Sequence, residues 1–65
     1  MIYVKKINGT DMVLNCELIE SIEANPDTTI TLISGKKIIL SDNIETVIRK
    51  VIEYKRQIMI NDLNV

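Results

Sequence analysis

The sequence contains no histidine and a single cysteine, Cys16. One cysteine cannot form an intramolecular disulfide bond, and a Cys/His zinc cluster cannot be built without histidine. Cys16 also has no cationic neighbour in sequence that would activate its thiol as a nucleophile. We therefore expect no enzymatic activity, no catalytic, cofactor-binding or metal-binding residues, and a reduced Cys16 that fills a small space in the core.

Aromatic residues and basic charge are also scarce. Phenylalanine and tryptophan are absent, which leaves Tyr3 and Tyr54 as the aromatic side chains. Two aromatics are too few for the stacking platforms that grip single-stranded nucleic acid. The 8 basic residues are outnumbered by 9 acidic ones, whereas nucleic-acid-binding domains usually carry a basic patch or surplus. We therefore expect no nucleic-acid partner.

Long apolar runs are missing too, because no stretch approaches the ~20 residues of a membrane-spanning helix. From Met1 to Lys6 the apolar residues precede the charged ones, which is the reverse of a signal peptide. The sequence thus favours a cytoplasmic protein that inserts no segment into a membrane.

The sequence does contain a large apolar share. It has 65 residues, of which 46% are hydrophobic, and we assign one domain to 1–60 and a flexible tail to 61–65. A domain of this size buries only a limited fraction of its surface. We interpret the surplus as a second buried surface, in a homo-oligomer or against a partner. A monomer with scattered exposed isoleucines is the alternative.

Turn signals separate a series of short β-rich runs. Asn8-Gly9 predicts a hairpin with a type I′ turn, Pro26 and Asp27 predict a second turn, and Ser34-Gly35 a third. A short turn at Cys16 leads into the third strand. Ser34 to Lys37 is not a phosphate loop, since it lacks the full spaced motif and opens a strand rather than a helix. The predicted strands span 2–7, 11–15, 20–24, 28–33 and 36–40.

One amphipathic helix is predicted over 43–59. Asp42 is the expected N-cap, and Glu45 three residues later completes a capping box. The predicted fold is α+β, a meander of about five short antiparallel strands with one C-terminal amphipathic helix packed on the sheet. The stripe expected to cover the sheet consists of Ile44, Val47, Ile48, Val51 and Ile52.

A candidate interaction surface is predicted from residues that we do not expect to be buried in the core of the monomer. The first strand, 2–7, is the expected open edge, a natural template for pairing with another chain. The Lys36-Lys37 pair is a possible partner contact, although such pairs are often only the solvated end of a hairpin. The apolar residues that we expect the core to use least are Tyr3, Ile7, Ile58, Met59 and Ile60.

The motifs "LNCELIESIEANPDTTITLISGKKIIL" and "IETVIRKVIEYKR" resemble the small flagellar FlbD/SwrD family of bacteria. The resemblance runs from Asn8-Gly9, through Pro26-Asp27-Thr28 and Gly35-Lys36-Lys37, to Tyr54-Lys55-Arg56, and departs at Cys16, where a proline is usual. It implies an accessory factor in motility and swarming that raises motor power through the stator units. It also implies contact with a flagellar motor or stator protein at the inner face of the membrane, without known catalytic or ligand-binding residues.

A weaker similarity links the same strand and helix pattern to LytTR DNA-binding domains, which would make the chain a nucleic-acid module. The acidic balance argues against this alternative, and the chain is shorter than that domain.

Overall fold

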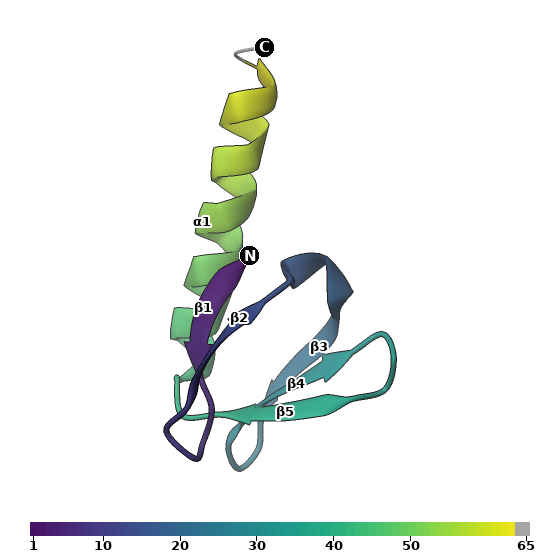
Figure 1. The fold of residues 1–65 in the computed structure, drawn as a ribbon, viewed down its shortest axis with the longest axis vertical. Coiled ribbons are helices and arrows are strands. Elements are labelled where there is room, and N and C mark those ends of the chain that lie inside the picture. Colours follow the sequence, from purple (N-terminus) through teal and green to yellow (C-terminus); the bar gives the residue numbers. More distant parts are fainter. Residues whose placement is uncertain (64–65) are drawn as a thin grey trace.

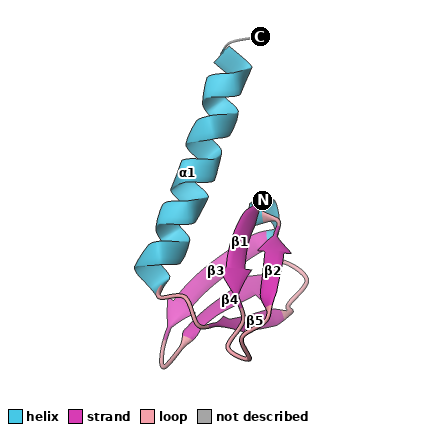
Figure 2. Cartoon of the chain, turned by 60° about the vertical axis from the view of Figure 1, so that its left-hand side comes forward, coloured by secondary structure: helices cyan, strands magenta, loops and turns pink. Residues whose placement is uncertain are grey.

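The computed structural model describes the backbone of residues 1–63 and the side chains of residues 1–58. It confirms the predicted α+β meander, with five antiparallel strands followed by one helix that stands beside them (Figures 1 and 2). A short 3₁₀ turn, η1, occupies the place where the sequence predicts a turn before the third strand. The elements are β1 (Ile2–Lys5), β2 (Asp11–Leu14), η1 (Cys16–Leu18), β3 (Ile19–Ala24), β4 (Thr28–Leu32), β5 (Lys37–Leu40) and α1 (Ile44–Leu63).

The strands form a β1-β2 hairpin and a β3-β4-β5 sheet. The two are joined where the chain after β1 meets the end of β5, through a bridge between Lys6 and Leu40. The Ile7 amide donates to the Ile39 carbonyl at 2.9 Å, and the Ser41 amide donates to the Lys5 carbonyl at 2.9 Å. The expectation that 2–7 is an open edge is therefore wrong for its second half, which lies between β2 and β5.

Two hairpin turns share one construction. In the first, the Lys6 amide donates to the Thr10 carbonyl at 2.8 Å and the Gly9 amide donates to the Lys6 carbonyl at 2.9 Å. Gly9 has a φ of 90°, and no described non-glycine residue has a positive φ. This is the pattern of a three-residue loop that ends in a left-handed glycine, so the predicted type I′ turn is wrong although the hairpin is right. The β4-β5 turn repeats the pattern, with Gly35 at a φ of 93°. At the remaining turn, the Asn25–Pro26 peptide bond is cis, which the sequence did not predict.

The core lies where the inner faces of the two sheets meet α1. Alternation along β1 and β5 buries every second side chain, as expected for strands with one solvated face. Ile30 in β4 and Val47 in α1 are fully buried, and Cys16 is buried as the sequence predicts. The buried apolar cluster consists of Ile2, Val4, Leu14, Cys16, Ile30, Ile38, Leu40 and Val47.

The start of α1 differs from the predicted capping box. The Asn43 side chain accepts a hydrogen bond from the Thr46 amide at 2.8 Å, so Asn43 is the N-cap. The Asp42 carboxylate instead accepts from the Lys5 amide in β1 at 2.9 Å. Asp42 is not available as the cap because it ties the chain before α1 to the first strand.

The buried face of α1 is narrower than the predicted stripe. Val47 is fully buried, and Val51 and Tyr54 pack against the core cluster, which places one line of residues against β1 and β3. Ile48 and Ile52 are 43% and 53% exposed, so the prediction that they cover the sheet is wrong. The helix also runs to Leu63, beyond the predicted end at 59 and past the rest of the fold (Figure 1). The expected tail therefore has helical backbone at 61–63, while 64–65 lie outside the described residues.

Candidate interaction surface

Large apolar side chains are exposed on several elements of this small fold. Tyr3 is 74% exposed, Ile33 is 64% exposed and Ile7 is 55% exposed. Water contact with so much apolar surface is unfavourable, and a surface of this kind is typical of proteins that bind other proteins. The exposed large apolar residues are Met1, Tyr3, Ile7, Val13, Leu18, Ile33, Ile39, Ile48 and Ile52.

The residues that the sequence predicts for an interaction surface do not form one patch. Ile7, Lys36 and Lys37 come together around one hollow, whereas Tyr3 lines a separate groove against α1. Ile58 is half-buried on α1. The side chains of Met59 and Ile60 lie outside the described residues.

The sequence did not predict several exposed apolar residues, because alternation does not show which face of a strand is exposed to solvent. Ile39 belongs to the outer face of β5, and Ile33 follows β4 at a turn. One signal could have identified Ile33. The segments "KINGT" and "LISGK" place an isoleucine immediately before the turn's polar residue and glycine in both hairpins.

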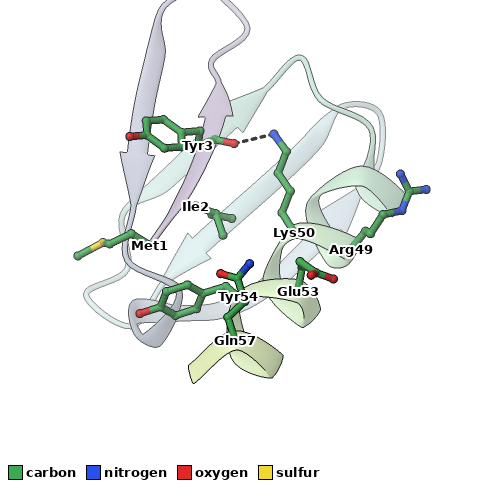
Figure 3. A pocket seen from close by; sticks show the side chains of 8 residues that line it. All are labelled: Met1, Ile2, Tyr3, Arg49, Lys50, Glu53, Tyr54 and Gln57. Carbon is green, nitrogen blue, oxygen red and sulfur yellow. Dashed lines mark hydrogen bonds between the residues drawn. The ribbon is translucent and has the colours of Figure 1, made fainter. Parts of the chain in front are cut away.

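The groove lies between the start of β1 and one side of α1, with a volume of about 500 Å³ (Figure 3). Lys50 extends from α1 toward β1, and its Nζ donates to the Tyr3 carbonyl at 2.6 Å. This bond fixes the helix against the strand and also occupies a carbonyl on the open side of β1. The groove is lined by Met1, Ile2, Tyr3, Arg49, Lys50, Glu53, Tyr54 and Gln57.

The edge of β1 that faces away from β2 is therefore not a free template for another strand. On this edge, the Tyr3 carbonyl accepts a hydrogen bond from the Lys50 ammonium, and the Lys5 amide donates one to the Asp42 carboxylate. Occupied edge groups of this kind block strand addition. At this edge, a partner would therefore be contacted by side chains and not by backbone hydrogen bonds of an added strand.

The hollow lies between the β1-β2 turn and the start of β5, with a volume of about 300 Å³. Its apolar lining includes Ile7 and Ile39, whose backbones are joined by the 2.9 Å hydrogen bond described above. Three lysines line it and no acidic residue does. The lining consists of Lys6, Ile7, Asn8, Met12, Lys36, Lys37, Ile38 and Ile39.

Within the described part of the chain, no group of three or more histidine, cysteine, aspartate or glutamate side chains is placed to hold a metal ion. Cys16, the one thiol, is buried in the core. Among the described residues, no helix combines the length and apolar character needed to cross a membrane.

Comparison with known proteins yields one match. A family model described as FlbD, flagellar and swarming motility proteins, matches residues 1–59. No curated protein and no solved structure matches the chain. The matched residues include all five strands and most of α1, so the groove and the hollow both lie within the region that the family model covers. The match confirms the resemblance that the sequence motifs indicate.

Proposed function

Because the chain belongs to the FlbD family of flagellar and swarming motility proteins, we propose that it is a non-catalytic accessory factor that supports flagellar rotation by binding a motor or stator protein. The family gives the process, which is flagellar and swarming motility. The observation that supports a binding role is the exposed apolar surface, with Tyr3 and Ile7 more than half exposed in a chain of 65 residues.

A deletion strain tests the process and the level at which the protein acts. We expect normal filaments by electron microscopy, but slower swimming and impaired swarming, because an accessory factor changes the output of an assembled motor. Re-expression of the wild-type chain restores both. Unchanged swimming and swarming after a clean deletion contradict the proposal.

Site-specific photo-crosslinking tests the contact itself. A photoreactive amino acid at Tyr3, which is 74% exposed, is compared with one at Asp27, an exposed turn position that lines neither the groove nor the hollow. We expect position 3, and not position 27, to capture a motor or stator protein in flagellated cells. Capture that is equal at both positions, or absent at both, contradicts a specific contact through this surface.

A further inference from the structure

The charge distribution sets the lysines of the hollow apart from the other lysines of the chain. Lys5 pairs with Asp11 at 3.2 Å, and Lys55 pairs with Glu17 at 3.2 Å. Lys50 donates to the Tyr3 carbonyl. Among the described side chains, the lysines without an ionic or hydrogen-bonding partner are the three that line the hollow, namely Lys6, Lys36 and Lys37.

The backbone holds these lysines at one place. Lys6 belongs to the β1-β2 turn, which is joined to β5 through the Ile7–Ile39 hydrogen bond. The Lys36 carbonyl accepts a hydrogen bond from the Leu32 amide at 2.8 Å, which closes the β4-β5 turn, and Lys37 is the first residue of β5. Like charges that gather without a partner repel one another, and a bound anionic group relieves that repulsion.

Apart from Asn8, the other residues that line the hollow are apolar, namely Ile7, Met12, Ile38 and Ile39. A volume of about 300 Å³ exceeds the ~150 Å³ that holds a benzene-sized group, so one large apolar side chain fits. A free small anion would leave this apolar lining wet. A flat lipid surface would contact the rim and leave the hollow unfilled.

We propose that the hollow docks an acidic segment of a partner protein, with one apolar side chain in the hollow and flanking carboxylates against Lys6, Lys36 and Lys37. This inference rests on the proposed function and adds the chemistry of the partner. According to this inference, the lysines of the hollow, and not the groove beside α1, give the protein its preference for a partner of negative charge.

A short peptide provides the first test. The intact chain is titrated with the terminally blocked peptide Glu-Glu-Leu-Glu-Glu, and binding is followed by the amide NMR signals of the turn at Ile7 and of β5. We expect shifts confined to this region, loss of binding when the leucine is replaced by serine, and no binding of Lys-Lys-Leu-Lys-Lys. Affinity should fall severalfold, by about three- to tenfold, between low salt and 0.5 M salt, because exposed charges are then screened within ~4 Å.

Two matched pairs of variants locate the site. Lys37→Glu should weaken peptide binding by about fivefold or more, whereas Arg56→Glu, the same charge change on the far part of α1, should not. Ile7→Asp should also weaken binding, whereas Ile33→Asp should not. Ile33 is a close control because it holds the same turn position and its amide is likewise hydrogen-bonded at 2.9 Å. Amide spectra confirm that each variant is folded.

Other occupants are outcomes of the same experiment. Tighter binding to phosphatidylglycerol vesicles than to the peptide, or to a duplex DNA of random sequence, with loss in Lys37→Glu, would overturn the proposal in favour of that ligand. Equal peptide binding by Lys37→Glu and Arg56→Glu would also overturn it.

Motility separates this inference from the proposed function. In a deletion strain, we expect Arg56→Glu to restore swarming and Lys37→Glu to restore it only in part. If the deletion impairs swarming but Lys37→Glu and Ile7→Asp restore it fully, the acidic docking site is wrong and the accessory role stands. If the deletion has no effect on motility, the accessory role itself fails, whatever the peptide binds.

Discussion

Asn43 is the residue on which the start of α1 depends. Its side chain satisfies the Thr46 amide at 2.8 Å, one of the helix amides that have no partner within the helix. We expect Asn43→Ala to lower the free energy of unfolding by about 1 kcal/mol and Asn43→Asp to preserve it. Urea denaturation measures both variants. A fully stable Asn43→Ala variant would show that another residue caps the helix.

The sequence alone could predict that a cap lies at this position, but not which residue provides it. Asp42 and Asn43 are adjacent, and both are favourable N-cap types. The choice is made by the Lys5 amide, which engages the Asp42 carboxylate from 37 positions away in the chain. A contact this distant leaves no trace in the local pattern. The first hairpin shows the same limit of sequence-based prediction. Asn8-Gly9 predicts the hairpin itself, but not that the chain before this turn pairs with β5, which lies far away in the sequence.

At the scale of elements, α1 presents two neighbouring apolar lines, and only one of them is buried. Val47 is fully buried among the strands, and Ile48 beside it is 43% exposed. We expect Val47→Asp to unfold the domain, because it places an unpaired charge in the core. Ile48→Asp should change the free energy of unfolding of the monomer by only about 0.5 kcal/mol, as is usual at a surface position. Circular dichroism melting of the two variants, with Ile48→Ala as a control, decides between the two faces.

Hydrophobic periodicity predicted that α1 exists and is amphipathic, and both are correct. It could not predict which edge of a wide stripe meets the sheet. That edge is fixed by the Lys50 bond to Tyr3 and by Asp42 at Lys5, which together set the rotation of the helix against β1. The strands were easier to predict, because a period of two leaves only two faces to choose between. Assembly of the hollow from Lys6, Lys36 and Lys37 required the β1–β5 pairing, which no short segment of sequence reveals.

At the scale of the whole molecule, the shape is elongated. The principal extents are 41 × 22 × 19 Å, and the radius of gyration is 12.5 Å, against about 11 Å for a compact domain of this length. The excess comes from α1, whose second half extends past the strands (Figure 2). A helix that projects in this way has a side that no strand of the same chain covers.

We expect this side of α1 to pair with the same side of a second copy. An antiparallel arrangement brings Ile48 of each helix opposite Ile52 of the other, so the exposed apolar residues of one copy cover those of its partner. Sedimentation over a range of micromolar concentrations should show a reversible dimer. Ile48→Lys should shift the chain to monomer without unfolding it, because Ile48 is not part of the core, whereas Ile33→Lys should leave the dimer intact. A strict monomer at high micromolar concentration would contradict self-association. A dimer insensitive to Ile48→Lys would instead place the contact on another of the exposed apolar surfaces.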